Sequence, residues 1–233
     1  MKVTTDACLF GAWVAYRIQA AAKEPNRILD IGAGTGVLSL MLAQATHHSM
    51  IDALEINEHA YLEAKTNFSS SPWSERTKVF ETSLQHFEPE AKYDLIICNP
   101  PFFESSLKGK DHNKNQALHE MTLTQNELLR YATKHLSSKG ALFILYPEQE
   151  MQALLNKSSN YNLLPGLEIS IRNKPNSNVF RKMVQLGFTN GETEQSEIII
   201  RAEGNKYTQR FWDLLKPYYL PYNDPNHETG LKA

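Results

Sequence analysis

Segments of strand character alternate with segments of helix character over residues 27–146, and this alternation constrains the fold more than any other feature of the chain. Short apolar runs predict five strands, at 27–31, 50–56, 77–81, 93–98 and 141–146. Helices are expected at 6–22, 37–45, 57–68 and 122–136. Strands that alternate with helices in this way form βαβ units around a parallel sheet. We therefore predict an α/β fold with a mostly parallel, twisted sheet and helices on both of its faces.

The C-terminal part of the chain has a different character. Three segments resemble strands with little helix between them, at 167–172, 182–188 and 198–201, and a last helix is expected at 207–215. Strands joined without crossover helices pair antiparallel, so antiparallel strands are expected at this end of the sheet. A polar, Lys-rich stretch at 104–116 predicts a loop. Since no linker divides the chain, one domain is expected over residues 1–233, made of an N-terminal helix (1–25), a central core (26–150), and C-terminal strands and a helix (151–233).

The formal net charge of −2 does not favour a protein that coats nucleic acid without specificity. Residues 1–150 carry 14 Lys and Arg against 18 Asp and Glu, a balance of −4, whereas residues 151–233 carry 10 against 8, a balance of +2. An RNA ligand would therefore have to bind local basic patches. Two candidate patches are Lys108, Lys110, His112 and Lys114, and Arg172, Lys174, Arg181 and Lys182.

The sequence carries no pattern for secretion, membrane insertion or metal binding. Its first residues lack a signal-peptide pattern, and no apolar run approaches the roughly 20 residues of a membrane span. Cys8 and Cys98 have no Cys or His partner at metal-ligand spacing, so no metal site is expected. These features predict a protein of the reducing cytoplasm with two buried thiols.

The segment from Asp30 to Gly36, Asp-Ile-Gly-Ala-Gly-Thr-Gly, lies between the first predicted strand and the helix that follows it. Glycines let a ligand approach the main chain, and the start of a helix directs N–H groups toward it. Glu55 lies 25 residues after Asp30, at the end of the second predicted strand, where a carboxylate can accept hydrogen bonds from both hydroxyls of a ribose. The Gly-x-Gly-x-Gly spacing differs from the Gly-x-Gly-x-x-Gly of dinucleotide sites. The pattern therefore predicts a nucleoside-containing cofactor other than a nicotinamide dinucleotide.

Asn99-Pro100-Pro101-Phe102 follows the apolar run at 93–98, and its two prolines must end that strand. The resulting corner lies at the carboxyl end of a strand, where ligands bind in open α/β sheets. The Asn99 side chain and a backbone carbonyl can accept hydrogen bonds from an –NH₂ group, while the Phe102 ring can stack on a planar base. The corner therefore suits methylation of a planar amine.

The glycine loop together with Glu55 resembles the class I S-adenosylmethionine-dependent methyltransferases. The resemblance implies a Rossmann-like fold and S-adenosylmethionine as the cofactor, with Asp30 beside its methionine end and Glu55 on its ribose. Ser83 stands where many members carry an Asp that contacts the adenine amino group. The cofactor-binding residues expected on this basis are Asp30, Gly32, Gly34, Gly36, Glu55, Ile56, Ser83, Leu84 and Asn99.

Superfamily members with the Asn-Pro-Pro-Phe corner methylate amino groups conjugated to a π-system, such as adenine N6 or the glutamine side chain. The resemblance implies that Asn99, Pro100, Pro101 and Phe102 form the catalytic corner, with Phe103 as a second ring near the base. The methyl group is already activated by the sulfonium, so positioning is expected to carry much of the rate without a strong general base.

Residues 2–6, 9–13, 99–108 and 198–220 resemble the bacterial tRNA (adenine-N6)-methyltransferases, which modify the adenine on the 3′ side of the anticodon in valine tRNA. The resemblance implies tRNA as the partner, and a monomer is expected. The residues expected to contact the RNA substrate are Thr5, Asp6, Phe103, Lys108, Lys110 and Lys114.

Three alternatives stay open from the sequence. A glutamine methyltransferase acting on a release factor has a similar corner, although that family usually adds an N-terminal helical domain. A guanine-N2 methyltransferase of ribosomal RNA often carries a duplicated domain. A non-catalytic RNA-binding module could keep the same fold, but intact Asp30, Glu55 and Asn99 argue against it.

Overall fold

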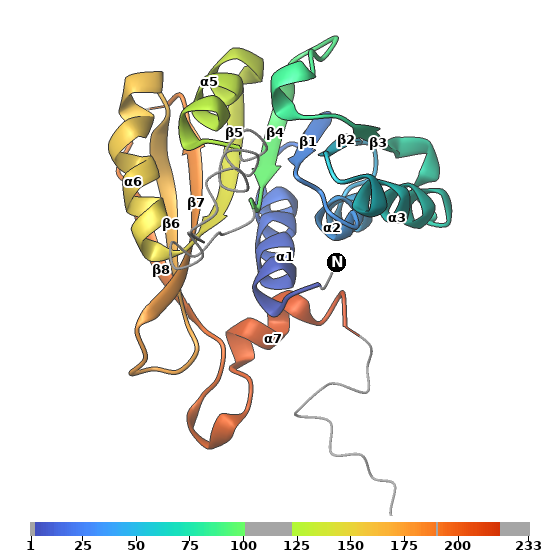
Figure 1. Ribbon diagram of the computed structural model, residues 1–233. Coiled ribbons are helices and arrows are strands. Elements are labelled where there is room, and N and C mark those ends of the chain that lie inside the picture. The colour runs from blue at the N-terminus through green and yellow to red at the C-terminus, as the bar shows by residue number, and fades with distance from the viewer. Residues whose placement is uncertain (1–2, 101–122, 190, 220–233) are drawn as a thin grey trace, which may run out of the picture.

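A single mixed sheet forms the centre of the computed structural model, which describes residues 3–100, 123–189 and 191–219. Its strands are β1 (Arg27–Ile31), β2 (Met50–Glu55), β3 (Thr77–Glu81), β4 (Tyr93–Cys98), β5 (Leu136–Tyr146), β6 (Leu164–Arg172), β7 (Val179–Gly187) and β8 (Glu194–Ile199). They lie in the order β3-β2-β1-β4-β5-β7-β6-β8 (Figure 1). Strands β1 to β5 are mutually parallel, whereas β7 pairs antiparallel with both β5 and β6. The predicted α/β class and its antiparallel C-terminal strands are confirmed.

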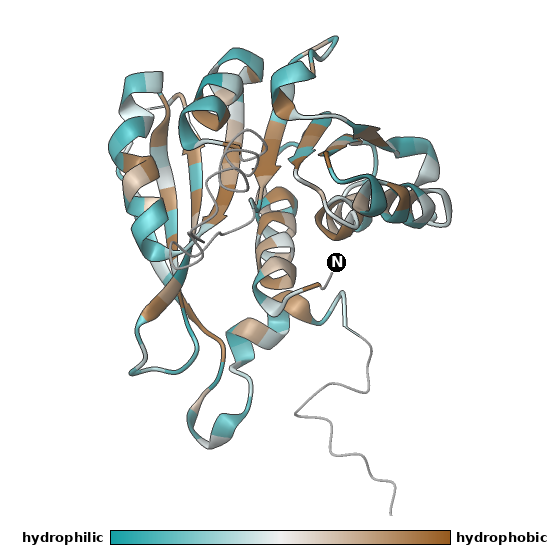
Figure 2. Ribbon diagram, in the orientation of Figure 1, coloured by the Kyte–Doolittle hydropathy of each residue, from teal (hydrophilic) through white to brown (hydrophobic). Residues whose placement is uncertain are grey.

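Helices cover both faces of this sheet, as the sequence predicts. They are α1 (Thr5–Ala20), α2 (Val37–Ala45), α3 (Glu58–Ser69), α5 (Gln125–His135), α6 (Glu148–Ser158) and α7 (Gln209–Leu215). Buried side chains of α1, α2 and α7 share one core, and those of α5 and α6 share the core on the opposite face. Figure 2 shows apolar residues concentrated in the central strands, with hydrophilic residues on the outer helix surfaces.

Strand β4 explains why its sequence is a continuous apolar run. Leu95 and Ile97 pack into the core with α1 and α2, while Ile96 and Cys98 pack into the core with α5 and α6. A strand covered on both faces needs apolar side chains at consecutive positions rather than alternate ones. The run therefore fixes β4 at the centre of the sheet and leaves its carboxyl end at Asn99.

Two element predictions are wrong. Helix α6 was not expected, because its buried stripe consists of only Met151, Leu154 and Ser158 among polar neighbours. Strand β5 begins at Leu136, so the polar residues 137–140, between the helix predicted at 122–136 and the strand predicted at 141–146, lie in the strand and do not end the helix. The pairing of β5 with β4 shifts there, and a Cβ at Gly140 would come within 2.9 Å of the Tyr93 carbonyl oxygen. Close backbone approach explains the glycine better than a helix end does.

The strand directions place one edge of the sheet in position for a site. Strands β1 to β5 all end at the same edge, and α1 begins there, as Figure 1 shows near the label N. Strands β6 and β8 also end at this edge, because β6 pairs antiparallel with β7 and parallel with β8. Within the part of the chain that the structure describes, no helix is long and apolar enough to cross a membrane.

Candidate active site

A cavity of about 810 Å³ lies at this edge of the sheet. Its volume falls within the roughly 300–1,000 Å³ typical of small-molecule sites. The walls come from the loop after β1, the ends of β2 and β4, the turn after β3, the start of α1 and the start of β7. Lining residues include Thr4, Asp6, Gly32, Glu55, Ile56, Ser83, Leu84, Asn99, Pro100 and Arg181.

The glycine loop forms one wall, and its glycines have distinct reasons to be glycine. Gly32 has a φ of 72° and lines the cavity, and a Cβ added there would meet nothing within 4 Å. A ligand can therefore approach the backbone at this point. Gly36 has a φ of 84°, and a Cβ there would lie only 2.4 Å from Cε1 of Phe68 on α3. Gly34, with a φ of 59°, turns its N–H toward Glu55.

Glu55 is the last residue of β2 and is 92% buried, and its carboxylate contacts the glycine loop. Oε2 accepts a hydrogen bond from the Gly34 N–H at 2.8 Å, and Oε1 accepts one from the Asn57 N–H at 2.8 Å. Each carboxylate oxygen can accept a further hydrogen bond. The side chain is thus held rigidly while both oxygens retain acceptor capacity toward the cavity. This arrangement fits a ligand with two neighbouring hydroxyl groups, as in a ribose.

Asp30 lies behind the glycine loop and is not among the residues that line the cavity. Its Oδ2 accepts hydrogen bonds from the Ser39 hydroxyl at 2.7 Å and from the Ser39 N–H at 3.1 Å. Oδ1 is buried without a hydrogen-bond partner among the described residues. Burial raises the pKa of Asp30 to about 6, and the charge of Glu55 contributes to the same shift. A buried, partly satisfied carboxylate is costly, which marks it as a feature with a role beyond packing.

The turn after β3 supplies a further part of the cavity wall. Leu84 from this turn and Ile56 from the loop after β2 give the cavity apolar surface. The Ser83 hydroxyl lies 3.0 Å from Nδ1 of His86, one turn further along the chain. When Ser83 donates to that nitrogen, its oxygen can still accept a hydrogen bond from a ligand. The sequence prediction missed His86, although its position three residues after Ser83 is compatible with such a pair.

Asn99 and Pro100 both line the cavity at the end of β4. The Asn99 Oδ1 atom is buried and has no hydrogen-bond partner within the described residues. An unpaired buried acceptor destabilises the folded protein by about 1–3 kcal/mol. A ligand that donates a hydrogen bond to this oxygen would remove that penalty, and its binding would be more favourable by a similar amount. The remaining predicted residues of the corner and its loop lie outside the described residues: Pro101, Phe102, Phe103, Lys108, Lys110 and Lys114.

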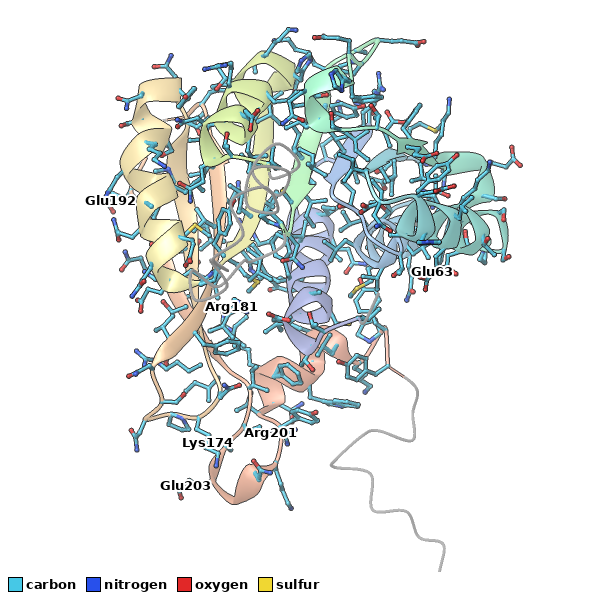
Figure 3. The ribbon with its side chains drawn as sticks, viewed as in Figure 1. Glu63, Lys174, Arg181, Glu192, Arg201 and Glu203 are labelled. Atoms are coloured by element: carbon cyan, nitrogen blue, oxygen red, sulfur yellow. The ribbon has the colours of Figure 1, made fainter. Side chains whose placement is uncertain are left out.

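The start of α1 and the start of β7 form the last wall. Thr4 caps α1, since its hydroxyl accepts the Ala7 N–H at 3.4 Å, and it lines the cavity. Of the two residues predicted here, Asp6 lines the cavity and Thr5 does not. Asp6 Oδ2 lies 3.1 Å from Nε of Arg181, as an ion pair whose two side chains are 17% and 25% exposed. Arg181 is labelled at the centre of Figure 3, between the sheet and the start of α1.

No group of His, Cys, Asp and Glu side chains arranged to hold a metal occurs among the described residues. The cavity lining does contain hydrogen-bond acceptors, among them Glu55 and Asn99, together with the guanidinium of Arg181. Such a site can bind a nucleoside through its hydroxyls and an amine through its N–H groups.

Comparison with known proteins agrees with this geometry. The family model described as the methyltransferase small domain matches residues 16–162. A tRNA1(Val) (adenine(37)-N6)-methyltransferase of Christiangramia forsetii is 36% identical over 224 residues, which is 94% of this chain and 91% of the relative. The protein of the same name from Flavobacterium johnsoniae is 37% identical over 225 residues, which is 94% and 93% of the two chains.

Solved structures share the fold at much lower identity. A predicted O-methyltransferase from Agrobacterium tumefaciens superposes with a TM-score of 0.68 at 17% identity, covering 90% of this chain and 94% of that one. A glycopeptide N-methyltransferase in complex with S-adenosyl-L-methionine gives a TM-score of 0.57 at 8% identity, covering 77% and 94%. These two likenesses concern the fold alone, and family membership depends on the closer relatives. The resemblance seen in the sequence is thereby confirmed, and the chain belongs to the methyltransferase small domain family and, within it, to the tRNA1(Val) (adenine(37)-N6)-methyltransferases.

Proposed function

We propose that this protein transfers the methyl group of S-adenosylmethionine to N6 of an adenine in tRNA, at position 37 of valine tRNA as in its named relatives. The observation that carries the proposal is the buried Oδ1 atom of Asn99, an acceptor without a partner among the described residues, in the wall of a nucleoside-sized cavity. An exocyclic amine supplies the N–H group that this oxygen lacks. Membership of the family indicates that the reaction at this site is methyl transfer to adenine N6.

The residues around the cavity fit the proposed cofactor, which supplies a sulfonium-activated methyl group when bound. Glu55 has acceptor capacity for two ribose hydroxyls, because each of its oxygens receives only one hydrogen bond from the protein. Gly32 leaves room for close approach at the loop. Ile56 and Leu84 offer apolar contact to an adenine ring, and the Ser83 oxygen can accept from its amino group.

The catalytic contribution of this chain is the positioning of the target amine. The nitrogen lone pair of adenine N6 is delocalised into the ring, so the amine is a weak nucleophile. The Asn99 Oδ1 atom and the Pro100 carbonyl oxygen accept hydrogen bonds from the two N–H groups of this amine. These hydrogen bonds orient the nitrogen lone pair toward the methyl group. In this proposal Pro101 stiffens the corner and Phe102 stacks on the base. The proton leaves to water after transfer, since the product is acidic enough to need no strong base.

The RNA would present its adenine from a single-stranded loop, where a base can be unstacked and inserted into a protein cavity. Asp6 and Arg181 form an ion pair in the cavity wall, and the proposal assigns them, with the neighbouring Thr5, to contact with the entering base. The proposal keeps Phe103, Lys108, Lys110 and Lys114 as RNA contacts. It also takes the protein to act as a monomer in the cytoplasm, where tRNA is modified.

A labelling experiment tests the proposed function. The protein is incubated with methyl-labelled S-adenosylmethionine and a valine tRNA transcript made in vitro, and the digested RNA is analysed for labelled nucleosides. We expect label in N6-methyladenosine, and none with a transcript that carries guanine at position 37. Release factor is offered in a parallel reaction. Label in that protein together with unlabelled tRNA would contradict the proposal in favour of a glutamine methyltransferase.

A further inference from the structure

A basic hairpin stands beside the cavity, and apart from Arg181 at its base it has no role in the proposed reaction. It consists of the end of β6, the turn at 173–178 and the start of β7, and we call residues 172–181 the β6–β7 arm. Because β6 runs parallel to β5 and β4, the tip of the arm lies at the same edge of the sheet as Asn99. Figure 1 shows this turn extending beyond the body of the sheet, on the side where α1 begins.

The arm starts inside the cavity and ends outside it. Arg181, at its base, lines the cavity and pairs across the hairpin with Ile171. Lys174, in the turn, lies three residues after Ile171 along the chain. At about 3.3 Å per residue, the tip lies roughly 10 Å beyond the cavity wall. A ligand whose reacting group enters the cavity would therefore meet the arm with its adjoining parts.

The arm has the composition of a surface that binds phosphate groups. Its sequence, Arg-Asn-Lys-Pro-Asn-Ser-Asn-Val-Phe-Arg, holds three cations, three asparagines and no acidic residue. The Lys174 side chain is exposed in the turn, and no ion pair or hydrogen bond of its ammonium occurs among residues 3–100, 123–189 and 191–219. Figure 3 labels Lys174 at this end of the molecule, with Arg201 and Glu203 labelled near it in the view.

The turn is also held in one conformation. The Ser177 hydroxyl donates to the Lys174 carbonyl oxygen at 2.9 Å and accepts the Lys174 N–H at 3.0 Å. Arg172 donates to the Ser177 carbonyl oxygen and forms an ion pair with Glu197 on β8. The Arg201 N–H donates to the Asn173 carbonyl oxygen at 3.0 Å, which ties the arm to the chain after β8. A preorganised turn loses little conformational entropy when it binds.

Two arginines next to this turn lie over aromatic rings. The guanidinium of Arg201 is 4.3 Å from the centre of the Tyr207 ring, and that of Arg181 is 5.7 Å from the Phe180 ring. Guanidinium groups held over aromatic rings suit phosphates and unstacked bases of RNA. An acidic peptide would use the same charges but would leave the position of the arm beside a base-sized cavity unexplained.

We propose that the β6–β7 arm binds the phosphate backbone of the RNA next to the target adenine, with Lys174 as a phosphate contact. The proposal rests on the proposed function and adds the surface that holds the RNA outside the cavity. Lys174 acts in binding and touches neither the reacting amine nor the cofactor. Its charge should therefore affect the affinity for RNA and its dependence on salt, and leave cofactor binding unchanged.

The test compares Lys174→Glu with Lys139→Glu, a matched charge reversal at an exposed site near the opposite edge of the sheet, early in β5. Affinity for the valine tRNA transcript is measured over a series of salt concentrations, together with the affinity for S-adenosylmethionine. For Lys174→Glu we expect tRNA affinity to fall by about five- to tenfold and the slope of log affinity against log salt to shrink by about one. Lys139→Glu should match the wild type within about twofold.

The outcomes separate the two proposals. If the wild-type protein methylates the transcript and both variants bind it equally, the arm proposal is overturned and the proposed function stands. If Lys174→Glu lowers cofactor affinity as much as tRNA affinity, the residue acts through the fold and the arm proposal is again overturned. If the wild type never methylates tRNA, the proposed function itself fails.

Discussion

The two sides of the cavity are built in different ways. The side formed by β1, β2 and β3 is held by short contacts between neighbouring strand ends, such as the Glu55 carboxylate on the Gly34 and Asn57 amides. The other side brings together the end of β4, the start of α1 and the start of β7, and its ion pair joins Asp6 to Arg181 across 175 positions of the sequence. In the proposed function the first side binds the nucleoside cofactor and the second side binds the substrate. Changes on the two sides should therefore separate cofactor binding from substrate turnover.

The largest expected effect is on the substrate side, from Asn99→Ala. Removing one positioned acceptor should lower the rate of methyl transfer by about 10²- to 10³-fold, because the amine is no longer held toward the methyl group. The affinity for S-adenosylmethionine should change by less than about threefold. Single-turnover methylation and calorimetric titration of the cofactor measure the two quantities. Turnover near the wild-type rate would remove Asn99 from the mechanism.

A second prediction concerns stability on the cofactor side, where Asp30 is buried with its pKa raised from 3.8 to about 6. The folded protein holds this proton more tightly than the unfolded chain, so the stabilisation is complete below about pH 4 and is lost as the pH rises through about 6. The free energy of unfolding of the cofactor-free protein should fall by about 3 kcal/mol over this range from Asp30 alone.

Asp30→Asn should flatten that part of the pH profile, since an amide does not ionise between pH 4 and 7. Urea unfolding at a series of pH values measures the effect. Asp213→Asn, at an exposed position of α7, is the control and should keep the wild-type profile. An unchanged slope in Asp30→Asn would mean that Asp30 ionises normally in the folded protein.

The third prediction is for Glu55→Gln, the counterpart of Asn99→Ala on the cofactor side. The amide keeps one acceptor oxygen and loses the charge, so hydrogen bonds to the ribose hydroxyls weaken. Cofactor affinity should fall by about ten- to a hundredfold, in line with about 1.5–3 kcal/mol for hydrogen bonds to a charged group. At saturating cofactor, single-turnover transfer should remain within a few-fold of the wild type. Glu58→Gln, exposed at the start of α3, should change neither quantity.

The same contrast explains what the sequence could predict. Glu55 is the last residue of β2, and the glycine loop and Asn99 directly follow β1 and β4. Parallel strands bring their carboxyl ends together, so these residues could be placed in one site from local patterns. Arg181 appeared in the sequence only as one of several cations, because its position in the cavity depends on the antiparallel pairing of β7 with β5 and β6. Helix α6 could not be predicted for a related reason, because its packing buries only a narrow stripe between polar residues. Contacts between residues that are distant in the sequence cannot be predicted from the pattern of neighbouring residues.

The smallest expected effect comes from Arg181→Met on the substrate side. The change leaves the shape of the cavity wall largely intact and removes the guanidinium beside the entering base, while Asp6 loses its ion-pair partner. We expect the KM for tRNA to rise by about three- to tenfold, the cofactor affinity to stay constant, and kcat to change by less than about twofold. Arg181→Lys should restore part of the KM, because it returns the charge without the planar fork of donors. Arg130→Met, at an exposed position of α5, is the matched control. An equal loss of cofactor affinity in Arg181→Met would mean that the two sides of the cavity are energetically coupled, and the separation drawn between them would not hold.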